Sequence, residues 1–286
     1  FGKIMNEVNK KQKDFWSGKG GDVWVEKQDA MDNMLEPLGK AALNKLPEEL
    51  EGNLLDIGCG CGSTALNIAN SQSKGLKVTG VDISKPMIDQ AIKLAKERNL
   101  ENIDFKVLDV QTELLTENFY SSAFSRFGVM FFEDPIKAFQ NINRSLKADA
   151  NLAFVCWQSP KLNPWQSLSM QVIKEFVDLP SLPERSPGPF AFEDIDYLRS
   201  ILVSSNFRDI KIESYEQEVT MFSGKSLEEA SRDYLSINPT VTEILKQSSN
   251  SAVKEISKSL ESLFERYSDG NGLHFESATW IVSAKK

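Results

Sequence analysis

Short apolar runs alternate with stretches of helical periodicity through the middle of the chain. The apolar runs lie at 53–57, 76–82, 103–108, 121–127 and 151–157, and the helical stretches lie at 63–70, 85–98 and 134–146. Short apolar or β-branched runs predict buried strands, and apolar positions three and four residues apart predict helices. Strands that alternate with helices favour a mainly parallel sheet with helices on both of its faces.

The N-terminal flank has a different pattern. Residues 1–50 are polar and helix-rich, with two tryptophans in the glycine-broken stretch 15-FWSGKGGDVW-24. Apolar residues recur at helical spacing through 28–46, where Pro37 is expected to split the helix or to start a second one.

The C-terminal flank completes the predicted sheet. Residues 158–190 carry six of the 11 prolines and predict a loop, a helix and another loop. We then expect a helix at 193–205, a strand at 208–220, amphipathic helices over 225–269 with a break near Pro239, and a last strand at 273–284. The predicted fold class is therefore α/β, with a Rossmann-like, seven-stranded, mostly parallel sheet, helices on both faces and a helical cap.

These patterns divide the chain into four expected parts. They are an N-terminal helical lid (1–50), a Rossmann-like core (51–158), a cap segment (159–192), and a C-terminal part of the core (193–286) with a helical insertion at about 225–269. The lid, cap segment and insertion are expected to cover the carboxyl edge of the sheet, where open α/β sheets bind ligands.

Composition and charge narrow the function classes. The 286 residues carry a formal net charge of −8, which argues against a nucleic-acid partner, because phosphate binding needs a basic surface. No apolar run approaches the roughly 20 residues needed to span a bilayer, and no signal peptide is visible, so we expect a cytoplasmic protein without membrane insertion. Three cysteines without a second Cys/His pair predict neither a disulfide framework nor a metal site. The chain could form a homodimer.

The stretch 53-NLLDIGCGCGSTALNIA-69 predicts a ligand-binding loop after the first strand. Glycines there let backbone N–H groups and a helix N-terminus face a ligand. Gly58, Gly60 and Gly62 follow the spacing G-x-G-x-G, whereas a dinucleotide fingerprint needs G-x-G-x-x-G and a P-loop needs G-K-[ST]. The loop therefore suits a ligand without a pyrophosphate.

Two acidic residues follow the next two predicted strands. Asp82 ends the second strand, where an acid accepts hydrogen bonds from both ribose hydroxyls of a nucleotide. Asp109 follows the third strand, where a carboxylate can accept from an exocyclic amine such as that of adenine. Polar features at three successive strand ends together indicate an adenosine without phosphates.

The motifs D-I-G-C-G-C-G, V-D-I-S and L-D-V together resemble a class I S-adenosylmethionine-dependent methyltransferase. The stretch 123-AFSRFGVMFFEDPIKAFQNINRSLKADANLAFVCW-157 is similar to the type-11 and ubiquinone/menaquinone-biosynthesis-like group. The resemblance covers about 53–157, and one departure is 147-KADA-150, where the family usually has a Pro-Gly-Gly-type turn. It implies S-adenosyl-L-methionine as the cofactor, S-adenosyl-L-homocysteine as the product, and a small-molecule methyl acceptor.

The resemblance also implies which residues bind the cofactor. Asp56 and the loop would hold its amino-acid end, Asp82 the ribose, and Asp109 the adenine edge. The whole expected set is Trp16, Trp24, Gln28, Asp56, Gly58, Cys59, Gly60, Gly62, Asp82, Ile83, Met87, Asp109, Val110, Ser125, Arg126 and Phe127.

Several residues have a structural alternative. Arg126, at a strand end among phenylalanines, could bind a carboxylate of the cofactor or substrate, or pair with a protein acid. Trp157 and Trp165 could form a wall of the substrate pocket or belong to the core. His274, the only histidine, could act as a general base but is expected to pair within the sheet. Arg126 and His274 are thus weak catalytic candidates, and no catalytic residue is assigned.

A methyltransferase of this kind works mainly by proximity and desolvation, with in-line attack on an already activated methyl group. The absence of a Ser/His/Asp set or paired carboxylates fits that mechanism and leaves the acceptor atom open. Two other functions remain: a non-catalytic cofactor-binding regulatory or assembly protein, and another enzyme on the same fold, such as an aminopropyl transferase or a dehydrogenase.

Overall fold

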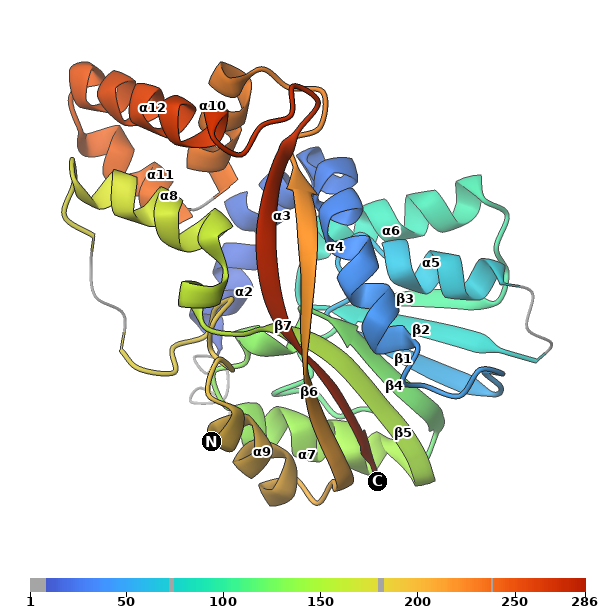
Figure 1. Cartoon of the computed structure of the whole chain (residues 1–286). Helices are drawn as coiled ribbons and strands as arrows, with labels where there is room; N and C mark the ends of the chain where they lie inside the picture. Colours follow the sequence, from blue (N-terminus) through green and yellow to red (C-terminus); the bar gives the residue numbers. More distant parts are fainter. Residues whose placement is uncertain (1–8, 72–74, 180–182, 238) are drawn as a thin grey trace.

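The computed structural model of the chain describes residues 9–71, 75–179, 183–237 and 239–286. Seven strands form one open sheet in the order β3-β2-β1-β4-β5-β7-β6 (Figure 1). The strands are β1 (Asn53–Ile57), β2 (Lys77–Asp82), β3 (Ile103–Val107), β4 (Tyr120–Arg126), β5 (Leu146–Trp157), β6 (Arg208–Met221) and β7 (Leu273–Lys285). The first five are parallel and β7 is antiparallel to both β5 and β6, so the predicted sheet is confirmed.

Helices cover both faces of the sheet. The helices α4 (Gln28–Leu43), α5 (Ser63–Asn70) and α6 (Lys85–Glu97) lie on one face, and α7 (Pro135–Ser145) and α9 (Ile195–Ser204) lie on the other (Figure 1). Local sequence sets where several of them begin. The side chains of Ser84, Asp134 and Asp194 accept backbone hydrogen bonds at the starts of α6, α7 and α9, as side chains at helix N-caps commonly do.

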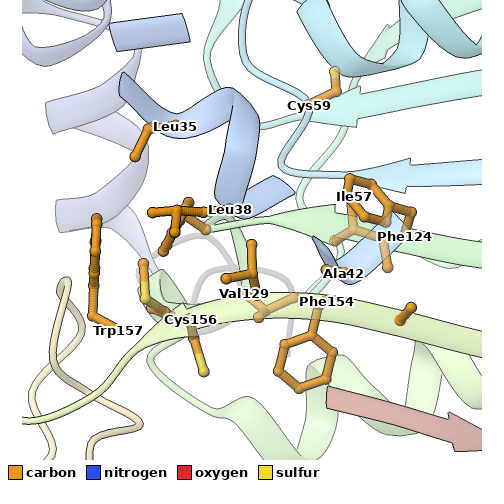
Figure 2. Close-up of a cluster of buried hydrophobic side chains, with 14 of the residues drawn as sticks. Leu35, Leu38, Ala42, Ile57, Cys59, Phe124, Val129, Phe154, Cys156 and Trp157 are labelled. Carbon is orange, nitrogen blue, oxygen red and sulfur yellow. The ribbon is translucent and has the colours of Figure 1, made fainter. Parts of the chain in front are cut away.

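The helix α4 connects the N-terminal region to the centre of the core. Figure 2 shows its residues Leu35, Leu38 and Ala42 beside Phe124 of β4 and Phe154 of β5, all of them buried. Complete burial of a leucine side chain stabilises a fold by about 1.5–3 kcal/mol. Several such contacts therefore fix α4 against the middle of the sheet.

Two local predictions were wrong. Pro37 lies inside α4, which continues through it without a break. A proline inside a helix costs about 3 kcal/mol, and the apolar face buried on both sides of Pro37 offsets that cost. The stretch 147–150, predicted as a turn, is part of β5, where Asp149 has a left-handed φ of 62° and the register with β4 shifts. A β-bulge therefore replaces the expected turn.

The remaining helices lie at the carboxyl edge of the parallel strands (Figure 1). They are α2 (Lys10–Trp16), α3 (Lys19–Glu26), α8 (Pro164–Lys174), α10 (Leu227–Ile237), α11 (Pro239–Gln247), α12 (Asn250–Glu265) and the short 3-10 helices η1 (Val129–Phe131) and η2 (Pro160–Leu162). The helices α2 and α3 belong to the predicted lid, whose first eight residues lie outside the described part of the chain. Among the described residues, no helix is both long and apolar enough to cross a membrane.

Candidate cofactor site

The loop between β1 and α5 is built on left-handed glycines. Gly58, Gly60 and Gly62 have φ values of 63°, 56° and 81°, a region that side chains other than glycine rarely adopt. A Cβ atom on Gly58 would lie 2.7 Å from the Cα atom of Gly128, so this loop and the end of β4 touch backbone to backbone. The sequence therefore forces a tight turn at the carboxyl edge of the sheet, in which the N–H groups of Cys59 and Gly62 donate to backbone oxygens of the protein.

Asp82, at the end of β2, fixes the position of this loop. The backbone N–H of Gly60 donates to Asp82 Oδ2 and the N–H of Ser84 donates to Oδ1, each at 2.8 Å. Burial raises the pKa of Asp82, and these backbone donors partly offset the rise. Each carboxylate oxygen has two lone pairs, so both can still accept a hydrogen bond from a ligand hydroxyl.

Asp56, on β1, carries a buried oxygen atom without a partner. Its side chain is 2% exposed, and no described residue donates a hydrogen bond to Oδ2. Burial raises the pKa of Asp56 to about 7, with Asp82 adding to the rise and Arg126 opposing it. A buried, unpaired carboxylate oxygen is costly, and a ligand ammonium group would satisfy it. The α-ammonium group of S-adenosylmethionine fits this requirement.

Asp109 follows β3 and is also buried. The backbone N–H of Gln111 donates to its Oδ1 at 2.9 Å. Its Oδ2 accepts from Thr112 Oγ1 at 2.8 Å and from Asn9 Nδ2 at 3.1 Å. The next residue, Val110, is 4% exposed and packs in the core. Asn9 is a site residue that our sequence analysis missed, because 100 residues separate it from its partner and no motif surrounds it.

The end of β4 joins the same edge. Ser125 Oγ donates to the backbone oxygen of Ile57 at 2.7 Å and accepts from the N–H of Gly128 at 3.3 Å, which ties β4 to the glycine loop. Arg126 forms a half-buried ion pair with Asp32 of α4. Of the two alternatives for Arg126, the structure therefore shows the pair with a protein acid.

An aromatic row extends from β4 toward the cap. Phe127 has a φ of 60° and stacks on Trp157, with ring centroids 4.5 Å apart. Trp165 lies 5.0 Å from Trp157 and 6.3 Å from Phe190. Trp157 is only 4% exposed, so in this structure it packs as a core residue. A left-handed, non-glycine residue such as Phe127 is held only by its surroundings, here by this stacking.

The lid helices lie against the site. Trp16 packs edge-on against Trp24 and against Phe131, with centroid distances of 6.1 and 5.0 Å. Ser84 Oγ donates to the backbone oxygen of Trp16 at 2.6 Å, and Ser17 Oγ donates to that of Ile83 at 3.1 Å. The lid is thus hydrogen-bonded directly to the segment that follows β2.

Three more of the predicted residues surround the glycine loop and the start of α4. A Cβ atom on Gly60 would lie 3.5 Å from Met87 Sδ and 3.8 Å from Trp24 Nε1, so both side chains border the loop. Gln28, at the start of α4, donates to Asp32 at 3.4 Å and accepts from Gln90 of α6 at 3.3 Å. Gln28 therefore links the lid side of α4 to α6.

Other reactive side chains are placed elsewhere or are inert. His274 lies 3.1 Å from Glu218 of β6 and 3.2 Å from Asp269, which precedes β7. This part of the antiparallel β6–β7 pair extends beyond the end of β5. The three cysteines are buried and free, and burial raises the pKa of Cys61 to about 12 and that of Cys59 well above its usual value. No group of metal-ligating side chains is present in the described residues.

Comparisons with known proteins agree with this geometry. Residues 54–149 match the family model of a methyltransferase domain. The chain is 30% identical to aklanonic acid methyltransferase DauC of Streptomyces sp. (strain C5) over 119 residues, or 41% of this chain and 54% of that protein. It is 24% identical to the ubiquinone/menaquinone biosynthesis C-methyltransferase UbiE of Citrifermentans bemidjiense over 59% of this chain and 70% of that one.

One solved structure of the same fold is a phosphoethanolamine N-methyltransferase 2 of Haemonchus contortus, bound to phosphomonomethylethanolamine and S-adenosylhomocysteine. The TM-score is 0.52, and 20% of residues are identical over 87% of this chain and 52% of that one. The chain thus spans only about half the length of DauC and of this enzyme. The predicted methyltransferase domain and the predicted fold are confirmed.

Proposed function

We propose that this chain, which contains a class I, S-adenosylmethionine-dependent methyltransferase domain, transfers the methyl group of that cofactor to a small molecule. The observation that carries the proposal is the placement of Asp56, Asp82 and Asp109 at the carboxyl ends of three neighbouring strands, where Asp82 also holds the glycine loop. Each acid meets a different need of the cofactor: an ammonium group, a ribose diol and an exocyclic amine.

The residues around these acids would hold the cofactor from several sides. The tight turn at Gly58, Gly60 and Gly62 would let the amino-acid end of the cofactor approach the backbone closely, and Ile83 and Met87 would give the adenine an apolar wall. Trp16, Trp24 and Gln28 would cover the methionine end from the lid. These roles agree with the burial and contacts of the side chains described above.

The cofactor supplies a methyl group already activated by the positive sulfonium. The chain has to orient an acceptor in line with that methyl group and to exclude water. The aromatic row that begins at Phe127 and the lid tryptophans supply an apolar boundary for this purpose. His274 contacts the carboxylates of Glu218 and Asp269 where β6 and β7 extend beyond β5, so the mechanism assigns it no proton transfer.

Two observations favour a small-molecule acceptor. The net charge of −8 disfavours nucleic acid, and the relatives DauC and UbiE are named for aklanonic acid and for ubiquinone and menaquinone biosynthesis. The structure also contains an apolar cavity between α4, α10 and the end of β6, lined by Lys27, Ala30, Met31, Met34, Met221, Phe222, Asp233 and Ile237. This cavity has a volume of only about 20 Å³, room for little more than one water molecule, so an acceptor would enter there only if the adaptable methionine side chains move.

The test is calorimetric titration with S-adenosylmethionine and S-adenosylhomocysteine, followed by methyl transfer to a panel of phenolic, carboxylic and amine acceptors. We expect wild-type binding and loss of binding in Asp82→Ala, because Asp82 also holds the Gly60 amide in place. Asp89→Ala is the matched control, since Asp89 is exposed and pairs only with Lys85 among the described residues. Failure of the folded wild type to bind either molecule would refute the proposal. Binding without turnover of any acceptor would favour the regulatory alternative.

A further inference from the structure

Hydrogen bonds from both its backbone and its side chain hold Asn9 beside Asp109. Its backbone N–H donates to Glu133 Oε2 at 3.0 Å, and its side-chain Nδ2 donates to Asp109 Oδ2 at 3.1 Å. Its φ is 65°, and its backbone oxygen accepts the hydrogen bond of Lys13 that begins α2. Asn9 therefore cannot turn away without breaking contacts on two sides.

The side-chain oxygen of Asn9 has no partner among the described residues. Asn9 is 3% exposed, and Oδ1 is one of the few buried polar atoms there without a hydrogen bond. The orientation of this amide is fixed by its neighbour, because a carboxylate oxygen accepts hydrogen bonds and only Nδ2 can donate one. Oδ1 is thus a free acceptor within the same amide group that contacts Asp109.

The acceptor capacity of Asp109 itself is mostly used. Its Oδ2 already receives Thr112 Oγ1 and Asn9 Nδ2, and its Oδ1 receives the N–H of Gln111. A carboxylate offers about four lone-pair positions, so one remains, on Oδ1. A ligand amine with two N–H bonds would need a second acceptor, and Asn9 Oδ1 is the unpaired one at this place.

We propose that Asn9 is a specificity-determining residue, whose side-chain oxygen accepts a hydrogen bond from the exocyclic amine of the cofactor's adenine. This inference rests on the proposed function and adds a role that the glycine loop and the strand-end acids do not supply. Asn9 lies at the start of the lid helix α2, so recognition of the amine also anchors the lid. A 6-oxo purine presents an acceptor at this position and cannot satisfy Asn9 Oδ1.

The test compares the affinities of S-adenosylhomocysteine and S-inosylhomocysteine by calorimetry in wild type, Asn9→Ala and Asn118→Ala. In Asn9→Ala we expect about tenfold weaker binding of the adenosyl ligand, the loss typical of one hydrogen bond, and little change for the inosyl ligand. The control residue Asn118 is also left-handed, with a φ of 49°, but is exposed and bonded to Lys286. Its variant should keep the wild-type ratio of affinities.

Each other outcome has a definite meaning. An equal loss of affinity for both ligands in Asn9→Ala would show that Asn9 only holds the lid in place. A gain of affinity for both would show that Asn9 obstructs the site. Either result overturns the inference. If wild type binds S-adenosylhomocysteine and Asn9→Ala has the wild-type ratio, the inference fails while the proposed function stands. If wild type binds neither ligand, the proposed function itself fails. Asn9→Gly accepts the left-handed φ of 65° without strain and provides the same test if the alanine variant disorders α2.

Discussion

At the scale of single residues, the protonation of Asp56 should make cofactor binding depend on pH. Burial raises its pKa to about 7 without a ligand, whereas an ammonium group beside it would lower that pKa, because opposite charges stabilise each other. The protonated form, which dominates below pH 7, must then lose its proton for the ligand to bind. We expect the affinity for S-adenosylhomocysteine to fall by up to about tenfold per pH unit below 7.

The variant Asp56→Asn supplies the control for this pH dependence. Asparagine keeps the shape of the side chain but does not titrate, so its affinity should be lower at pH 8 and nearly constant between pH 5.5 and 8. Calorimetry across that range in both proteins separates Asp56 from other titrating groups. An identical slope in wild type and variant would mean that another group controls binding.

The site residues that could be predicted from the sequence are those at the end of a strand or directly after it. Asp82 and Asp109 could be located because each comes directly after an apolar run, and the parallel sheet brings such positions to one edge. Pairings across long separations could not be predicted. Asn9 lies 100 residues before Asp109, and Asp32 lies 94 residues before Arg126. No local pattern distinguishes either of these partners from an ordinary surface residue.

At the scale of elements, the adjacent glycines Gly20 and Gly21 of α3 allow the effect of lid attachment on binding to be measured apart from the effect of helix propensity. A Cβ atom on Gly21 would lie 2.2 Å from the backbone oxygen of Trp16 and 2.6 Å from Ser84 Oγ. On Gly20 it would meet only the ring of Phe15, and a side chain can move. Alanine is favoured over glycine in a helix by about 1 kcal/mol at either position. We therefore expect Gly21→Ala to weaken S-adenosylhomocysteine binding by tenfold or more, and Gly20→Ala to leave it within about twofold.

Hydrogen exchange of the lid provides the second measurement on these two variants. Exchange through 10–26 should be faster in Gly21→Ala than in Gly20→Ala, because the clash displaces the contacts of α3 with Trp16 and Ser84. Equal exchange and equal affinity in the two variants would show that the lid does not depend on this close approach.

The glycine loop offers a comparable test within the core. Gly58→Ala adds a methyl group 2.7 Å from the Cα atom of Gly128, on top of the strain of its left-handed φ. Gly224→Ala has the same kind of strain, with a φ of 73°, but no atom lies within 4 Å of the added carbon. We expect Gly224→Ala to cost about 1–2 kcal/mol of the free energy of unfolding, and Gly58→Ala to cost clearly more. Denaturant unfolding of both variants measures the difference, and equal costs would mean that β4 moves aside freely.

Elements with strong local signals were predicted well. The helix α5 has the predicted bounds, and α6 and α7 begin within one residue of the predicted positions because a proline and a capping side chain mark them. Pro37 and the stretch 147–150 were misjudged because tertiary packing overrode a local signal. The apolar face of α4 holds the helix through its proline, and pairing with β4 and β7 extends β5 across a bulge.

At the scale of the whole molecule, the two long strands should couple the cap to the core. Both β6 and β7 run without interruption from the sheet into the cap, where Phe264 of α12 packs against Phe222 and Phe275. The central helix α4 in turn contacts β4, β5, β6 and β7. Within the described residues, these shared elements leave no segment at which the cap and the core could separate without loss of buried contacts. We therefore propose that the predicted parts of the chain unfold as one cooperative unit.

Calorimetric unfolding with and without S-adenosylhomocysteine tests that coupling. A ligand at 100 times its Kd stabilises the folded state by about 2.7 kcal/mol, which corresponds to a rise in Tm of about 4–5 °C for a chain of 286 residues. We expect a single transition that shifts as a whole, and no shift in Asp82→Ala at the same ligand concentration. Two transitions, of which only one responds to the ligand, would instead show that the cap and the cofactor site fold independently. In that case cofactor binding could not stabilise the cap. The acceptor itself would then have to order the part of the site that the cap forms.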